Sequence, residues 1–145
     1  MKRRRQKMLS RHLFEAIVKN DALRVRAALR AGADPRRAEA GGTTPLYEAS
    51  VSGRTGIVRL LLEAGAPPDA ESRGIGAEGT PLCAAACWGE ADTVRELLAH
   101  GADPNLREDD GAGRSPLDWA NAGPHPETVA VLTAAGAVDR AGTVT

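Results

Sequence analysis

Aromatic residues are scarce in this chain: one Phe, one Tyr and two Trp make up 3% of its 145 residues. The hydrophobic residues, 42% of the total, are therefore mostly Ala, Leu and Val. Small aliphatic side chains suit closely spaced helices better than the strands of a β-sandwich. The length suggests one domain, and the composition favours an all-α core within it.

Long uncharged runs and cysteines are also scarce. The longest uncharged runs, Gly79–Gly89 and Thr128–Val138, have 11 residues each, whereas a membrane-spanning helix needs about 20. The basic start of the chain leads into Arg11 and Glu15 instead of an apolar stretch, so no secretory signal is expected. Two cysteines do not make a disulfide framework, and a reducing, cytoplasmic compartment is expected.

The formal net charge of zero hides an asymmetry between the two halves of the chain. Residues 1–60 carry 14 Lys/Arg and 5 Asp/Glu, a net +9, and residues 61–145 carry 5 and 14, a net −9. Such an imbalance bears on partners and not on fold.

One sequence unit recurs along the chain. Its anchor, Thr44-Pro45-Leu46, returns as Thr80-Pro81-Leu82 and Ser115-Pro116-Leu117, at spacings of 36 and 35 residues. A copy without the anchor precedes these three, so four units are predicted, at about 11–37, 38–73, 74–108 and 109–138. A basic tail at 1–10, expected to be disordered, and a C-terminal tail at 139–145 flank them. Four columns of residues align across the units. They are Leu13, Leu46, Leu82 and Leu117; Ala16, Ala49, Ala85 and Ala120; Val25, Val58, Val94 and Val129; and Gly32, Gly65, Gly101 and Gly136, each followed by Ala.

Each unit has the signals of two helices. Thr or Ser before Pro is an N-cap followed by a favoured first helical residue, and this first helix is predicted to span 7–8 residues, ending near Ser52-Gly53 or Trp88-Gly89. Apolar residues at helical spacing predict a second helix, which the Gly of the last column stops in a left-handed C-cap. Neither helix can bury its apolar side alone, so the units must stack, with the Gly- and Pro-rich loops projecting.

These motifs identify the chain as similar to the ankyrin repeat family. Thr-Pro-Leu, the Gly that ends the first helix, Val-x-x-Leu-Leu and Gly101-Ala102-Asp103-Pro104-Asn105 carry the resemblance over residues 10–138. It implies an all-α solenoid of helix-turn-helix units with projecting β-turn or hairpin loops. The family usually has His three residues after the anchor Thr, whereas Tyr47, Cys83 and Asp118 stand there in this chain.

No chemical motif predicts an enzyme, a cofactor or a metal. The segment 74–79, Gly-Ile-Gly-Ala-Glu-Gly, matches the dinucleotide-binding fingerprint but follows no apolar strand, and the repeat explains it as a long loop. Cys83 and Cys87 lie on one helix face, but zinc would need two more ligands. The three histidines, His12, His100 and His125, each sit in a different unit, so inert thiols are expected instead of zinc ligands. The sequence contains none of the catalytic motifs Gly-x-Ser-x-Gly and His-Glu-x-x-His, and no phosphate loop that ends in Gly-Lys-Ser/Thr.

The resemblance implies a non-enzymatic scaffold that binds another protein on a concave surface made by the loop tips and the first helices. Trp88 is the best candidate anchor, with packing against the next unit as the alternative, and Trp119 is expected to pack between units. The rival function is an electrostatic tether, in which the basic half docks on nucleic acid or an anionic membrane. No aromatics are interleaved with the basic tail, so neither is the expected partner, and the chain is expected to be a monomer with weak, salt-sensitive self-association. The implied contact positions are Ala40, Gly41, Thr43, Gly76, Ala77, Gly79, Gly111, Ala112 and Arg114 on the loops, and Val18, Lys19, Val51, Ser52, Cys87, Trp88 and Ala122 on the helices.

Overall fold

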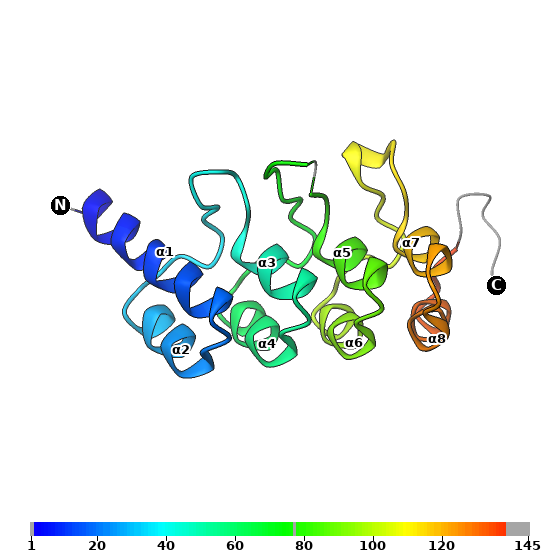
Figure 1. Ribbon diagram of the computed structural model, residues 1–145, viewed down its shortest axis with the longest axis horizontal. Coiled ribbons are helices and arrows are strands. Elements are labelled where there is room, and N and C mark those ends of the chain that lie inside the picture. Colours follow the sequence, from blue (N-terminus) through cyan, green and yellow to red (C-terminus); the bar gives the residue numbers. More distant parts are fainter. Residues whose placement is uncertain (1, 77, 139–145) are drawn as a thin grey trace.

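A computed structural model describes residues 2–76 and 78–138. In this part of the chain, eight α-helices form four antiparallel pairs that stand side by side in sequence order (Figure 1). The first helices of the pairs contact one another along one layer and the second helices along another; we call them the inner and outer helices. The all-α solenoid is thus confirmed. The inner helices are α1 (Lys2–Val18), α3 (Pro45–Val51), α5 (Pro81–Cys87) and α7 (Pro116–Ala122), and the outer helices are α2 (Ala22–Arg30), α4 (Thr55–Glu63), α6 (Ala91–Ala99) and α8 (Pro126–Ala134).

Three inner helices begin at the predicted Thr-Pro or Ser-Pro caps. The Thr44 hydroxyl accepts a hydrogen bond from the Tyr47 amide at 3.1 Å, and Thr80 caps α5 in the same way. Ser115 forms a capping box, because the Asp118 carboxylate also accepts from the Ser115 amide at 3.0 Å. These caps satisfy amides that a helix start otherwise leaves unpaired.

The outer helices end where a residue turns into the left-handed region. Gly65 after α4 and Gly101 after α6 have φ angles of +100° and +91°. L-residues with a Cβ rarely adopt this conformation, so glycine both stops the helix and turns the chain into the next loop. The predicted C-terminal signal is confirmed.

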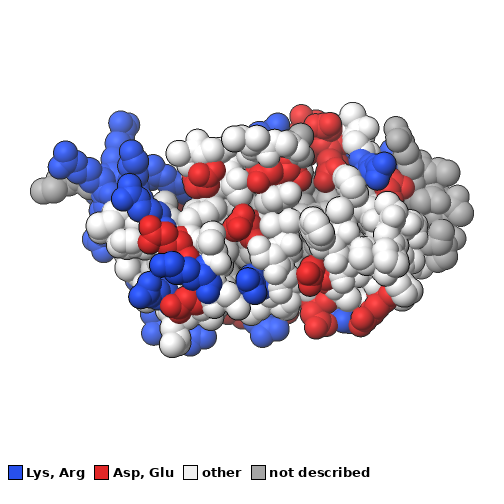
Figure 2. Space-filling view, viewed as in Figure 1, with Lys and Arg blue, Asp and Glu red and all other residues white. Residues whose placement is uncertain are grey.

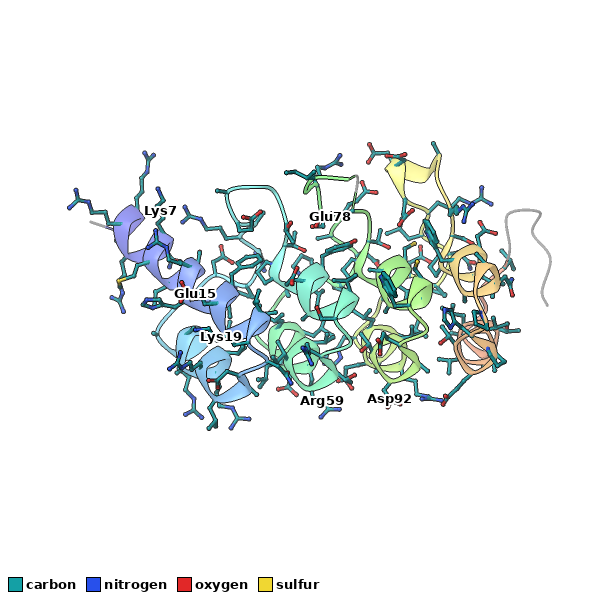
Figure 3. The ribbon with its side chains drawn as sticks, in the orientation of Figure 1. Lys7, Glu15, Lys19, Arg59, Glu78 and Asp92 are labelled. Carbon is teal, nitrogen blue, oxygen red and sulfur yellow. The ribbon has the colours of Figure 1, made fainter. Side chains whose placement is uncertain are left out.

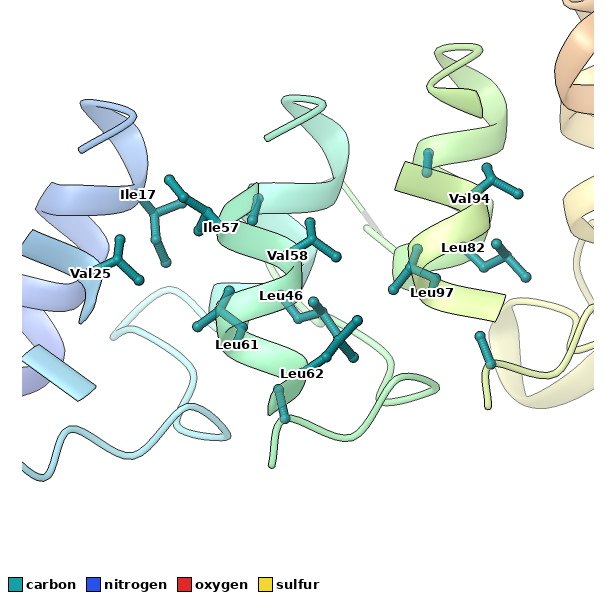
Figure 4. Packing of buried hydrophobic residues seen from close by; sticks show 14 of the residues in the cluster. Ile17, Val25, Leu46, Ile57, Val58, Leu61, Leu62, Leu82, Val94 and Leu97 are labelled. Atoms are coloured by element: carbon teal, nitrogen blue, oxygen red, sulfur yellow. The ribbon is translucent and has the colours of Figure 1, made fainter. Parts of the chain in front are cut away.

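The core runs through the stack as columns of equivalent residues. Ala49, Ala85 and Ala120 on successive inner helices are fully buried. Figure 4 shows the apolar side chains of successive helix pairs meeting between them, with Val58 and Val94 at equivalent places. No pair could bury this surface alone, so stability comes from contacts between neighbouring pairs. Leu13, Ala16 and Val25 are also buried, and the copy without an anchor is therefore a genuine helix pair.

The N-terminal segment differs from the expectation of a disordered tail, because Lys2–Ser10 is helical and belongs to α1. The Arg5 guanidinium donates to the Ala31 carbonyl at 3.1 Å, and the Gln6 amide donates to the Gly32 carbonyl at 2.9 Å. These carbonyls lie at the end of α2, where free acceptors and the helix dipole favour a cation. The predicted tail at 139–145 lies outside the described residues.

The outer helices are joined by polar contacts across the stack. Arg59 on α4 forms two hydrogen bonds of 3.0 Å with the Glu96 carboxylate on α6. Arg95 on α6 contacts Glu127 on α8 at 2.8 Å. Figure 3 shows Arg59 and Asp92 on the side of the molecule opposite Glu78. The charges of this outer face therefore serve the stacking itself.

Three long connections project from the stack on one side (Figure 1). We call residues 31–44, 64–80 and 100–115 the first, second and third fingers. Each is closed by backbone hydrogen bonds, such as Glu39 N to Thr43 O at 2.9 Å and Glu108 N to Arg114 O at 3.1 Å. In the second finger, Ser72 and Gly79 form an isolated antiparallel bridge. The fingers are therefore tight turns and hairpins, as predicted, and the third contains a short 3₁₀ helix, Asp109–Gly111. Within the described ranges, no helix has the length and apolar character needed to cross a membrane.

Candidate protein-binding surface

A cleft of about 290 Å³ lies between the inner helices and the second and third fingers. It combines side chains from three helix pairs with residues from both fingers. These residues are far apart in the sequence, from Tyr47 on α3 to Trp119 on α7, and they meet only because the helix pairs stack. Its lining residues are Tyr47, Ile75, Gly76, Glu78, Cys83, Ala84, Cys87, Trp88, Glu108 and Trp119.

Trp88 dominates the apolar surface of this cleft. It is the C-cap residue of α5, and 64% of it is exposed, which excludes the alternative that it is packed into the next unit. Ile75 at the tip of the second finger is 97% exposed. Large apolar side chains at such exposure contribute nothing to the core, and clustered exposed apolar residues mark interaction sites.

The floor of the cleft is negatively charged. Tyr47 is half-buried, and burial together with the nearby carboxylates of Glu78 and Glu108 raises the pKa of its phenol to about 12. Loss of the phenol proton would add a negative charge beside carboxylates that are already negative. The Tyr47 hydroxyl is therefore a neutral hydrogen-bonding group within an acidic surface.

Glu108 is held in place from the third finger. Its carboxylate accepts a hydrogen bond from the Trp119 indole at 3.0 Å, and partial burial raises its pKa. The Arg114 guanidinium stacks 4.7 Å from the centre of the Trp119 ring. Trp119 thus packs partly against the core, as expected, but it also lines the cleft.

Glu78 joins the first two fingers. One carboxylate oxygen accepts from the Ser72 hydroxyl at 2.6 Å and from the Gly74 amide at 2.8 Å. The other oxygen accepts from the Thr43 hydroxyl at 2.9 Å. Ser72 in turn accepts from the amide of Thr44, the N-cap of α3. The network sets the position of the fingers above the inner helices, and therefore the shape of the cleft.

The cleft brings together three of the sequence-predicted contact residues, Gly76, Cys87 and Trp88. Gly79 is buried in the stem of the second finger, where the Glu108 carboxylate occupies the space of a side chain, so it is not an accessible contact. Ala77 lies outside the described residues. That the accessible residues contact a partner stays a prediction. Val18, Lys19, Ala40, Gly41, Ser52, Gly111, Ala112, Arg114 and Ala122 are exposed but lie outside the cleft, and Thr43 and Val51 are half-buried.

Sequence reasoning missed seven residues of the cleft, Cys83 and Ala84 on α5 among them, and Tyr47 and Ile75 left a signal. Tyr47 stands where the family usually has His, and Ile75 is an isolated large apolar residue in a glycine-rich loop. Neither is what core packing needs. Glu78, Glu108 and Trp119 left no such signal, because their role depends on contacts between loops.

The two candidate sites for other chemistry are structural in this fold. Burial raises the pKa of the Cys83 thiol to about 12, and its sulfur lies 3.7 Å from the Arg114 carbonyl, so it is an inert donor. Among residues 2–76 and 78–138, no group of three His, Cys, Asp or Glu is placed to hold a metal ion. The described residues of the fingerprint-like segment, 74–76 and 78–79, lie in the second finger, and no strand precedes them among the described residues.

The N-terminal end of the inner layer has the opposite charge. A hollow of about 380 Å³ between α1 and the first finger is lined by three cations, Lys7, Arg11 and Arg37, and by two carboxylates, Glu15 and Glu39. Figure 2 shows Lys and Arg gathered over the α1–α2 end, whereas Asp and Glu lie over the middle of the stack and the fingers. The net +9 and −9 of the two halves are thus separated in space.

Stacked helix pairs with projecting fingers define a helical repeat protein. A family model described as "Ankyrin repeats (3 copies)" matches residues 67–140, about half of the chain, and a model of a single ankyrin repeat matches residues 41–73. The chain therefore belongs to the ankyrin repeat family, which confirms the resemblance. Repeats of this family generally mediate protein–protein interaction and are typically non-catalytic.

Curated relatives match this chain over a small part of their own length. The palmitoyltransferase Hip14 of Drosophila melanogaster is 36% identical over 88 residues, which are 61% of this chain and 14% of the relative. The E3 ubiquitin-protein ligase Ufd4 of the same organism is 33% identical over 130 residues, covering 87% of this chain and 4% of the relative. The potassium channel KOR1 of Oryza sativa subsp. japonica is 29% identical, covering 70% and 15%. The chain thus spans between 4% and 15% of the length of these relatives, and their names describe three different activities.

Proposed function

We propose that this chain is a non-enzymatic interaction module that binds a partner protein in the cleft between its inner helices and its fingers. The observation that carries the proposal is the Trp88 side chain, 64% exposed at the mouth of that cleft. An exposed tryptophan in a concave, partly acidic surface offers a large contact area, and such residues dominate binding energy at protein interfaces. The paired charges of the outer helices offer no comparable anchor.

Trp88→Ala is expected to weaken binding by about 2 kcal/mol, or about 30-fold in Kd, while the melting temperature stays unchanged. The ligand for this measurement is a 12-residue peptide selected from a random phage library against the immobilised full chain, and fluorescence anisotropy gives the Kd. Leu23→Ala is the matched control, because Leu23 is 77% exposed on the outer helix α2. Equal affinity of Trp88→Ala and wild type would contradict the proposal, as would a collapsed melting temperature.

The rival proposal, an electrostatic tether, draws on the basic residues of α1. Lys2, Arg3 and Arg4 are exposed and make no hydrogen bond or ion pair with other described residues. A tether predicts retention on heparin at physiological salt, with affinity falling steeply as salt rises. Elution at low salt together with salt-insensitive peptide binding would favour the interaction module.

The separated charges also lead us to propose weak head-to-tail self-association. Light scattering is expected to show a higher average mass in about 20 mM salt than in about 300 mM salt, because the electrostatic screening length shortens severalfold across this range. The contact does not close on itself and gives open-ended oligomers. Changing Lys2, Arg3 and Arg4 to Gln removes three charges without disturbing the contacts of Arg5 and Gln6, and should abolish most of the effect. A monomeric mass of the wild type at both salts would refute it.

A further inference from the structure

The carboxylates around the Trp88 cleft stand outside the ion pairs that join the outer helices. Arg107 aside, no Lys or Arg within residues 2–76 and 78–138 forms an ion pair with Glu48, Glu78 or Glu108. The nearby charge of Arg114 acts on Glu108 only in part, because burial still raises the pKa of that carboxyl. Arg95 and Arg59 on the outer helices, by contrast, are both paired with carboxylates of the next helix. The acidic groups of the cleft are thus not part of the charge pairing that holds the stack together.

Glu108 has capacity for another donor. One of its oxygens accepts from the Trp119 indole, and no described group donates to the other. Partial burial raises its pKa, so water solvates the carboxylate poorly. An apolar group in the cleft would deepen this desolvation without compensation, whereas a cation would compensate for it.

Trp88 offers a free aromatic face beside these carboxylates. Trp119 already carries the Arg114 guanidinium at 4.7 Å from its ring centre, which shows that this surface accommodates such a stack. No cation of the described residues lies over Trp88, although 64% of it is exposed. Cations are attracted to the face of tryptophan more strongly than to any other ring.

We propose that the cleft binds an arginine side chain of the partner protein, with the guanidinium against the Trp88 ring and its N–H groups directed at the Glu108 carboxylate. Arginine fits better than lysine, because its planar group stacks on a ring and donates several hydrogen bonds at once. The hollow at α1 has three cations against two carboxylates, so its net positive charge disfavours the same side chain and favours the α3–α7 part of the surface. This inference rests on the proposed function and adds the chemistry of the partner.

The test uses the peptide selected on the full chain, resynthesised with each arginine replaced in turn by citrulline. Citrulline keeps the shape of arginine and removes its charge. Replacement at one position is expected to weaken binding to the wild type at least tenfold. Glu108→Gln, which retains an acceptor for the Trp119 indole, is expected to weaken the parent peptide at least fivefold. On this variant the citrulline replacement should cost less than twofold, because the interaction is already lost.

Two controls separate charge from folding. Glu63→Gln removes a carboxylate from the exposed outer face of α4 and should leave the Kd unchanged. A thermal melt of each variant shows whether it folds; should Glu108→Gln melt lower, Trp88→Ala takes its place in the same cycle of peptides.

Each outcome decides between the two proposals. Full tolerance of citrulline, with binding still lost in Trp88→Ala, would overturn the arginine assignment and leave the interaction module standing. Selection of acidic peptides that bind through α1 would also overturn it. If no peptide depends on Trp88 or Glu108, or if none is selected at all, both the inference and the proposed function fall.

Discussion

Ala85→Asp is expected to abolish cooperative folding of this chain. Ala85 is fully buried in α5, at the centre of the stack, where α5 contacts both α3 and α7. A carboxylate in this position has no partner, and an unpaired buried charge costs several kcal/mol. Domains of this size have a total stability of about 5–15 kcal/mol. Because each unit is stabilised by its neighbours, damage in the middle removes two interfaces at once.

A circular dichroism melt measures this effect, and it starts at about 20 °C, where most domains are still folded. Ala130→Asp is the matched control: it makes the same substitution within helix α8, at an exposed position, and should melt close to the wild type. An unchanged melting curve for Ala85→Asp would show that the aligned alanines do not form the core.

Glu78→Ala is expected to lower the free energy of unfolding by about 2–4 kcal/mol, because hydrogen bonds to a charged group contribute about 1.5–3 kcal/mol each and are not additive. The change leaves three donors, from Thr43, Ser72 and Gly74, without their acceptor. Two of these residues, Ser72 and Gly74, are buried, so water replaces the lost acceptor poorly. Urea denaturation followed by circular dichroism gives the value.

Glu78→Gln separates the hydrogen bonds from the charge. One amide oxygen still accepts from the second finger, and the Thr43 hydroxyl can accept from the amide nitrogen, so an intermediate loss is expected. Glu63→Ala removes an exposed carboxylate from the outer helix α4 and should change stability by less than about 0.5 kcal/mol. A loss as small as this in Glu78→Ala would show that the fingers are not held by this network.

Most of the fold follows from chemistry that acts over a few residues. Thr44, Thr80 and Ser115 cap the helices that begin next to them, and Gly65 and Gly101 end helices by their own backbone conformation. Recurrence at 35–36 residues then turns these local signals into a stack, because equivalent positions must meet between units. The register, the lengths of the three inner helices that follow an anchor, and the buried alanine columns were accessible in this way.

The N-terminal helix shows where this reasoning stops. Five basic residues within the first seven resemble a solvated tail, since like charges at helical spacing repel one another. In the structure, Arg5 and Gln6 donate to carbonyls at the end of α2, 26 residues away. That stabilisation comes from a second helix and has no counterpart in the local pattern.

The candidate site divides along the same line. Repeat register was enough to select Trp88 as a residue at the open end of an inner helix, but its exposure depends on what the neighbouring unit leaves uncovered. Tyr47, Glu78 and Glu108 come from different units, and the fingers that carry the two glutamates are set by hydrogen bonds between loops. Helix caps and apolar periodicity act within one unit, so they are visible in a sequence. A cleft is the space left between units, and its shape and charge exist only after the units have stacked.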